Sequence, residues 1–155
     1  MDEATYIALC RTHLPALHRM AMSITGSHPD AEDAVQQALL KAWQHRHKAR
    51  PGLERAWVMR ILVNECYTLL RRRRREIPME ELPVRPGGVP EDSPLHAAIR
   101  TLPEKLRTPV LLKYMEGMSE KEVAGALRIP LSSVKNRLFR ARKLLKAKLN
   151  EEVGP

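Results

Sequence analysis

The sequence predicts an all-α fold with two small helical lobes joined by a Pro/Gly-rich linker, the C-terminal lobe containing a helix-turn-helix. Apolar residues recur at three- and four-residue steps, and no segment alternates as a half-buried strand does. Aromatic residues make up only 4% of the chain, which is low for a strand-rich protein. Five prolines and two glycines fall within residues 76–94, where no helix can persist. We therefore expect lobes at 1–75 and 95–152, with a flexible acidic linker at 76–94.

The charge balance favours a polyanionic partner. The 155 residues include 27 Lys and Arg against 18 Asp and Glu, a formal net charge of +9. Such a surface suits nucleic acid or an anionic membrane. No apolar run approaches the roughly 20 residues of a membrane span, and no signal-peptide pattern follows Met1. We expect a cytoplasmic protein without membrane insertion, in which Cys10 and Cys66 are reduced core thiols.

Three helices are predicted in the N-terminal lobe. Apolar residues from Tyr6 to Ile24 form the first, which the sequence Gly-Ser-His-Pro at 26–29 should end. The second should open at Asp30, in an acidic stretch that suits a helix N-terminus, and continue to Trp43. The third should run from about residue 53 to 75 and close on five consecutive arginines, 71–75, called the arginine run below.

The C-terminal lobe should contain four shorter helices, at 96–102, 103–116, 120–127 and about 131–149. Ser119 and Glu122 have the spacing of a capping box, which starts the third of them. The fourth helix carries an apolar stripe at steps of four, three, four and four, formed by Val134, Leu138, Ala141, Leu145 and Leu149. Helix, tight turn and helix in this order predict a helix-turn-helix, whose second helix would enter a major groove.

The last helix is strongly basic, with seven cations and no acid between residues 132 and 148. Arg137, Arg140 and Lys143 are expected roughly opposite the apolar stripe, where they could meet DNA. The alternative is a surface helix with a solvated basic face. Seven unopposed cations on the helix that the turn presents favour the DNA-binding interpretation.

The third helix of the N-terminal lobe is the second candidate for DNA contact. Arg60, Asn64, Tyr67 and Arg71 are spaced four, three and four, so they share one face. Five contiguous arginines repel one another unless an anion is near, which favours contact with phosphates. Neutralisation of the helix dipole, or a nuclear-localisation signal, is the alternative interpretation of such a run.

These segments, in this order, resemble the bacterial sigma-70 family. Residues 30–43 (DAEDAVQQALLKAW) resemble region 2.2, and residues 57–75 resemble regions 2.3 and 2.4. Residues 102–107 and 119–145 resemble region 4, most specifically through 129–142 (IPLSSVKNRLFRAR). Only these two regions are present, a layout similar to that of extracytoplasmic-function (ECF) sigma factors. The sequence departs from the family's usual pattern at Ser132, Ser133 and Asn136 in region 4, and at Gln37 and Leu40 in region 2.2.

The resemblance implies a non-catalytic subunit that binds core RNA polymerase and directs it to promoters. It implies that region 2.2 docks on the clamp helices of the largest polymerase subunit, through Asp33, Gln36, Gln37 and Leu40. It implies that the minus-ten element and adjoining phosphates meet Arg60, Asn64, Tyr67 and Arg71. Arg73 and Arg74 belong to the arginine run and are expected to meet phosphates beside that element. It implies that the minus-thirty-five element meets Ser133, Lys135, Asn136, Arg137 and Arg140. Members of the family are often held inactive by an anti-sigma factor.

Other functions find little support in the residues. His45 and His47 lie two apart, so on a helix they diverge, and no third metal ligand lies nearby in the sequence. The acids at 30–33 lack the partners of a two-metal nuclease. We expect no enzyme activity, metal, cofactor or small-molecule substrate. Two alternatives stay open: a stand-alone helix-turn-helix regulator, and a protein that holds polymerase without reading promoters.

Overall fold

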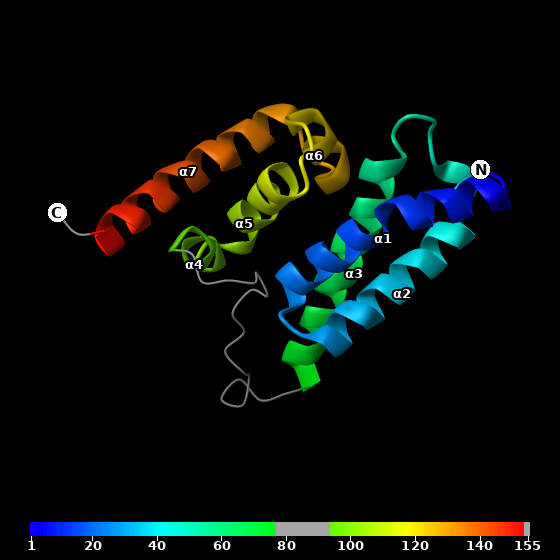
Figure 1. The fold of residues 1–155 in the computed structure, drawn as a ribbon, viewed down its shortest axis with the longest axis horizontal. Helices are drawn as coiled ribbons and strands as arrows, with labels where there is room; N and C mark the ends of the chain where they lie inside the picture. The colour runs from blue at the N-terminus through cyan, green and yellow to red at the C-terminus, as the bar shows by residue number, and fades with distance from the viewer. Residues whose placement is uncertain (77–93, 154–155) are drawn as a thin grey trace. The chain divides into compact units, whose positions relative to one another are not determined.

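The computed structural model of the chain describes residues 1–76 and 94–153, and all of its regular elements in these ranges are helical (Figure 1). The all-α prediction is therefore confirmed. The chain divides into two compact units, unit 1 (Met1–Gly88) and unit 2 (Val89–Pro155). The linker predicted at 76–94 falls almost wholly outside the described residues. We describe each unit separately.

Unit 1 is a three-helix assembly in which each long helix packs against the other two. Its elements are α1 (Glu3–Thr25), α2 (His28–Gln44), the short 3₁₀ helix η1 (Arg46–Lys48) and α3 (Glu54–Glu76). Leu17, Met20, Met59 and Leu62 are almost completely buried and form the centre of the core. The prediction of three helices in this lobe is correct, because the apolar spacing of each leaves one face to bury.

The start of α2 lies two residues before the predicted one. Ser27 is its N-cap and accepts a hydrogen bond from the backbone N–H of Asp30, at 3.4 Å. Pro29 therefore lies in the first turn of α2 and not in a break between helices. Its missing N–H costs nothing there, because the first N–H groups of a helix have no intrahelical partner. Gly26 ends α1 in the left-handed conformation, with φ 68°, and its N–H donates to the carbonyl of Met22. Only two residues, Gly26 and Ser27, then separate α1 from α2, so Asp30 is brought into the interior.

The two faces of α2 differ sharply. Its inner face carries four buried alanines at steps of three, four and four: Ala31, Ala34, Ala38 and Ala42. Small side chains let the backbones of α1 and α3 approach α2 closely. Its outer face is left to solvent and carries polar residues and one leucine. This division fixes which side of α2 is available to a partner.

Unit 2 is built around a long C-terminal helix. Its elements are α4 (Pro94–Arg100), α5 (Glu104–Val110), the π-helical turn η3 (Leu111–Met115), α6 (Glu120–Leu127) and α7 (Leu131–Val153). In this unit α7 packs against α4, α5 and α6. The helix predicted at 103–116 is divided into α5 and η3. In η3 the N–H of Glu116 donates to the carbonyl of Leu111, five residues earlier, at 3.2 Å.

The helix-turn-helix is formed by α6 and α7, and the predicted capping box starts it. Ser119 Oγ accepts from the N–H of Glu122 at 3.0 Å, and the N–H of Ser119 donates to Glu122 Oε1 at 3.1 Å. Arg128 ends α6 in the left-handed conformation, with φ 55°. The core beneath the motif includes Val123 and Leu138, which are 0% and 1% exposed.

Replacing Ser119 with alanine should lower the free energy of unfolding of unit 2 by about 1 kcal/mol, the usual cost of losing an N-cap. Urea denaturation of the full chain, followed by circular dichroism, measures this loss. Ser132→Ala is the matched control, because Ser132 is exposed in the first turn of α7. Equal unfolding midpoints for the two variants would contradict a stabilising capping box.

Candidate nucleic-acid and polymerase interface

The predicted polymerase-binding residues form one exposed face of α2, which we call the docking face: Asp33, Gln36, Gln37 and Leu40. They are spaced three, one and three residues apart, so they lie together on the helix. All four are exposed, and Leu40 keeps half of its surface in solvent. An exposed leucine among polar side chains gives this face the mixed character of a protein-binding surface.

The predicted minus-ten residues follow one side of α3. Asn64 and Arg71 are exposed, whereas Arg60 and Tyr67 are half-buried against the unit. Arg71 also donates from Nη2 to Thr68 Oγ1 at 3.3 Å, one turn earlier. The structure therefore places the four residues along one helix, with the most accessible ones at the second and fourth positions.

Glu65, an acid on α3, has an ion-pair partner on α2. Glu65 interrupts the otherwise apolar face that the sequence places on this helix, and its side chain is only 12% exposed. Lys41 of α2 forms an ion pair with it. The pair explains how an acid is accommodated between two packed helices.

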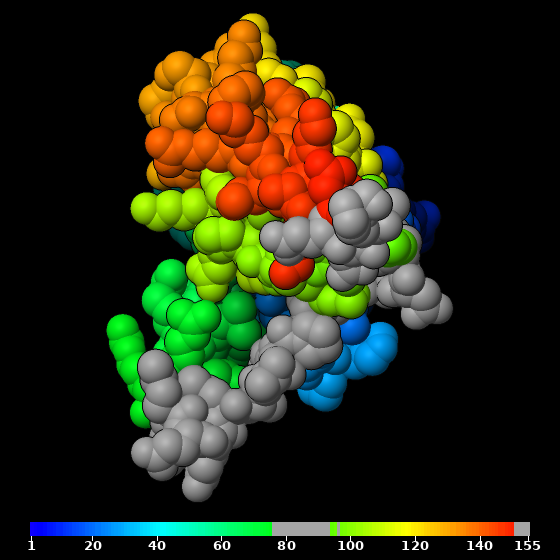
Figure 2. Space-filling view, turned by 90° about the vertical axis from the view of Figure 1, so that its left-hand side faces the viewer, coloured from blue at the N-terminus to red at the C-terminus, as the bar shows by residue number. Residues whose placement is uncertain are grey.

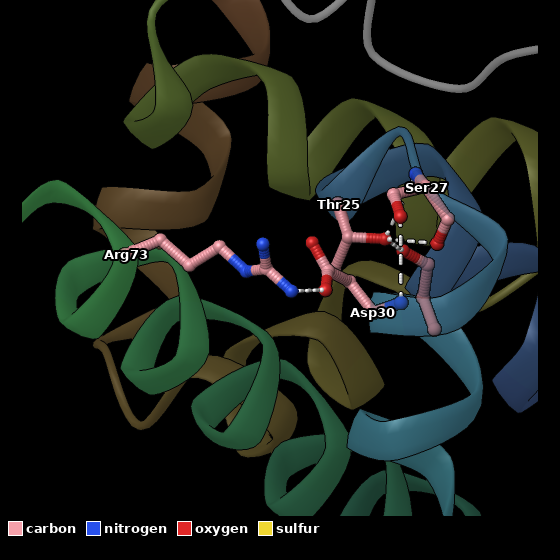
Figure 3. A network of polar contacts seen from close by, with 5 residues as sticks. Thr25, Ser27, Asp30 and Arg73 are labelled. Carbon is pink, nitrogen blue, oxygen red and sulfur yellow. Dashed lines mark hydrogen bonds and ion pairs between the residues drawn. The ribbon is translucent and has the colours of Figure 1, made fainter. Parts of the chain in front are cut away.

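The arginine run does not point uniformly to solvent. Arg71, Arg72, Arg74 and Arg75 are exposed, but Arg73 is half-buried. Its Nη2 forms an ion pair with Oδ1 of Asp30, at the start of α2 (Figure 3). Arg73, which was predicted to meet phosphates, thus has an ion-pair partner inside unit 1. The reason is helical spacing: Leu62, Cys66, Leu69 and Arg73 follow at steps of four, three and four, so Arg73 continues the inner face of α3.

The surroundings of Asp30 are polar but closed (Figure 3). Its side chain is 3% exposed, and its backbone N–H points to Ser27 Oγ. Thr25, which is fully buried, donates from Oγ1 to the carbonyl of Ala21 at 2.8 Å and accepts from the N–H of Ser27 at 3.4 Å. Asp30 lies in the first turn of α2, where the helix dipole favours a negative charge.

The apolar stripe of α7 is confirmed for Val134, Leu138, Ala141 and Leu145, which are buried, whereas Leu149 is half-buried. Arg137 was expected opposite this stripe, and that placement is wrong. Arg137 follows Val134 by three residues and precedes Leu138 by one, so it lies at the edge of the stripe and is half-buried. Ser133, in the first turn of α7, is also half-buried.

The outward surface of α7, which we call the recognition face, consists of exposed residues: Lys135, Asn136, Phe139, Arg140 and Lys143. Figure 2 shows α7, coloured orange to red, at the surface of the molecule. The sequence analysis did not select Phe139, which is 53% exposed and lies 5.3 Å from Lys143 Nζ, measured to the ring centroid. The sequence could have predicted this exposure, because a residue five positions after Val134 cannot lie on the buried stripe of the helix. An apolar ring among cations suits a thymine methyl group.

The basic surface continues beside α7 onto η3 and α6. Arg142 Nη1 donates to the hydroxyl of Tyr114 at 3.1 Å, and Lys113 forms an ion pair with Glu120 at 2.9 Å. The hydrogen bond from Lys113 holds the pKa of the Glu120 carboxyl below its usual range, and the charges of Lys113, Lys135 and Arg142 add to this. The acid at the start of α6 is thus surrounded by cations rather than exposed to repel DNA.

No site for metal or thiol chemistry stands out in the described ranges. No three His, Cys, Asp or Glu side chains come together there to hold a metal ion. Both cysteines are free: Cys66 is buried, which raises the pKa of its thiol to about 12, and Cys10 is half-buried. Among residues 1–76 and 94–153, no helix is both long and apolar enough to cross a membrane.

Comparison with known proteins identifies both units. The family model for sigma-70 region 2 matches residues 9–76, and a model for sigma-70 region 4 matches residues 93–145. The ECF RNA polymerase sigma factor SigM of Mycobacterium tuberculosis is 33% identical, over 91% of this chain and 75% of that protein. The chain belongs to the sigma-70 family, as an ECF sigma factor. In this sigma factor, region 2 corresponds to α1–α3 and region 4 to α4–α7.

Further relatives match most of this chain. The RNA polymerase sigma-E factor of Streptomyces avermitilis is 32% identical, over 92% of this sigma factor and 82% of that protein. ECF sigma factor SigE of Mycolicibacterium smegmatis is also 32% identical, but the match covers 59% of its length. Among solved structures, the sigma factor RpoE of Bartonella quintana, in complex with the anti-sigma factor NepR, aligns with a TM-score of 0.73 and 29% identity, over 91% of this chain and 94% of that one.

Proposed function

We propose that this ECF sigma factor binds core RNA polymerase through the docking face of α2 and reads promoters through α3 and α7. The minus-ten element and neighbouring phosphates would meet Asn64 and the exposed part of the arginine run, with Arg60 and Tyr67 alongside. The minus-thirty-five element would meet the recognition face, with Ser133 and Arg137 at its edge. In this proposal the chain acts in the cytoplasm as a specificity subunit and not as an enzyme.

One observation carries the proposal: the exposed docking face on α2 and the exposed recognition face on α7 lie within the segments that match regions 2 and 4. A stand-alone helix-turn-helix regulator would use α6 and α7 and leave the docking face and the arginine run without a role. Charge agrees with this division, because α7 has no acid between residues 131 and 150, whereas the docking face begins with an aspartate.

An anti-sigma factor is a further proposed partner. RpoE of Bartonella quintana is seen in complex with the anti-sigma factor NepR, and CnrH is seen in complex with the cytosolic domain of CnrY. CnrH is 26% identical to this chain and aligns over 97% of it, with a TM-score of 0.73. The likeness supports a protein partner of that kind and identifies no particular one.

The docking face is tested by replacing Asp33 and Gln36 together with alanine. We expect affinity for core polymerase to fall about tenfold or more, since truncating the few residues that dominate an interface costs more than about 1 kcal/mol each. Stability should change by less than about 0.5 kcal/mol, because both side chains are exposed. Titration of fluorescent sigma factor with core polymerase measures the affinity.

The matched control is Glu32→Ala, an exposed acid at the border of the docking face. It removes a negative charge from the same helix turn without truncating a residue of the face. Equal affinities for the wild type and the double variant would refute the docking face. An equal loss in the control would show a general charge effect instead.

A further inference from the structure

The ion pair between Asp30 and Arg73 joins two parts of unit 1 that the proposed function uses separately. Asp30 precedes Asp33 of the docking face by one turn of α2, and Arg73 is the central member of the arginine run. The two residues are 43 positions apart in sequence and meet where α2 starts and α3 ends (Figure 3). The contact therefore fixes the last turns of α3 against the start of α2.

The two partners are held very differently. Asp30 is 3% exposed, and its backbone N–H donates to Oγ of Ser27, a residue whose own N–H donates to Thr25 Oγ1. The side chain of Arg73, by contrast, is 42% exposed. The carboxylate is thus the rigid, buried member, and the guanidinium reaches in to it. A buried carboxylate needs a partner, because removing it from water without compensation is costly. The ion pair with this buried carboxylate therefore keeps the side chain of Arg73 turned inward.

The ion pair stabilises the C-terminal end of α3, which has few other buried contacts. Around Arg73 the helix consists of exposed arginines, which repel one another and bury little apolar surface. Helix ends with few buried contacts fray. One inward arginine bound to a rigid acid orients the turn, and it sets which neighbours face outward.

We propose that Arg73 is a positioning residue and not a phosphate ligand: its ion pair with Asp30 holds the end of α3 so that Arg71, Arg72 and Arg75 meet promoter phosphates. This inference rests on the proposed function, since it assumes that the arginine run meets DNA. It adds that one arginine of the run orients three others, and that an acid of α2 is needed for DNA binding.

The decisive variant is Asp30→Asn, because the two interpretations predict effects of opposite sign. If Asp30 only competes with DNA for Arg73, the variant frees a cation and should tighten promoter binding. If the pair positions the run, the variant should weaken promoter binding about tenfold, the size typical of a lost coupled contact. It should do so although the protein becomes more positive by one charge. Glu32→Gln is the matched control, since it removes an exposed acid from the same turn of α2.

The experiment measures promoter binding by reconstituted holoenzyme at several salt concentrations, well below the melting temperature of each variant. With Asp30→Asn we expect the slope of log Kobs against log salt to fall by about one to two, because fewer phosphates are neutralised. Affinity for core polymerase should stay within twofold of wild type. Loss of core affinity to the same extent would indicate a general fold defect and overturn the positioning role.

Rescue provides the second measurement. Arg73→Gln alone removes the positive charge that pairs with the buried carboxylate, and adding Asp30→Asn replaces the charged pair by two amides that can hydrogen-bond. We expect the double variant to bind promoters several-fold better than Arg73→Gln alone. A phosphate ligand at position 73 could not be rescued from inside the protein, so the absence of rescue would overturn the proposal.

Arg72→Gln separates this inference from the proposed function. Arg72 is exposed in the same run, so its loss should lower the salt slope by about one. An unchanged slope with Arg72→Gln would refute DNA contact by the run, and with it both proposals. A lowered slope with Arg72→Gln, together with Asp30→Asn binding as tightly as wild type or tighter, would overturn only the positioning role of Arg73.

Discussion

Replacing Leu138 with alanine is expected to lower the free energy of unfolding of unit 2 by about 3 kcal/mol. Leu138 is 1% exposed and lies in the middle of the apolar stripe of α7, the helix against which α4, α5 and α6 pack. A buried leucine truncated to alanine loses its transfer free energy and leaves a cavity, which together cost 2–5 kcal/mol, or about 3 in the middle of that range. A unit this small has little stability in reserve. Region 4 should therefore be largely unfolded under mild denaturing conditions.

Chemical denaturation of the full chain, followed by circular dichroism, measures this loss, and transcription from a promoter with a minus-thirty-five element shows its consequence. Leu144→Ala is the matched control on the same helix, because Leu144 is 48% exposed and its truncation opens no cavity. Similar destabilisation by both variants would contradict the assignment of Leu138 to the core. Binding to core polymerase should persist in both, because the docking face is in unit 1.

Replacing Arg140 with alanine should cost about 1–3 kcal/mol at the preferred minus-thirty-five element, the range for a well-made contact to a base. Arg140 is exposed on the recognition face, one turn beyond Asn136 and beside Phe139. Contacts to base edges carry sequence information, whereas contacts to phosphates do not. The variant should therefore also discriminate less between base pairs at one position of the element.

The measurement is binding of reconstituted holoenzyme to a panel of promoters with single base-pair changes, at several salt concentrations. Lys148→Ala is the control, an exposed cation two turns further along α7. It should weaken binding to all promoters alike, if at all, and lower the salt slope by at most about one. If Arg140→Ala lowered the affinity for all promoters equally and Lys148→Ala changed the sequence preference, the recognition face would be assigned to the wrong end of α7.

Local rules in the sequence sufficed for much of the fold and part of the site. Apolar spacing located every long helix, and the capping box at Ser119 located the start of α6, because both depend on neighbours within one or two turns. The docking face came from the resemblance to region 2.2, and the structure shows its four residues exposed on the side of α2 away from the buried alanines. The family was recognisable from ordered motifs and was confirmed by both region matches.

The tertiary structure decided which charged residues point inward from their helices and which point outward. Helical spacing places Arg73 on the inner face of α3, but only the packing of α3 against α2 brings it to Asp30 as an ion-pair partner. Arg137 was similarly misplaced, because a basic residue at the edge of an apolar stripe is half-buried or exposed according to what packs beside it. Periodicity therefore determined the helices of this protein, and its ordered motifs indicated the family. The pairing of Asp30 with Arg73 depends on contacts between distant segments, which exist only once the chain has folded.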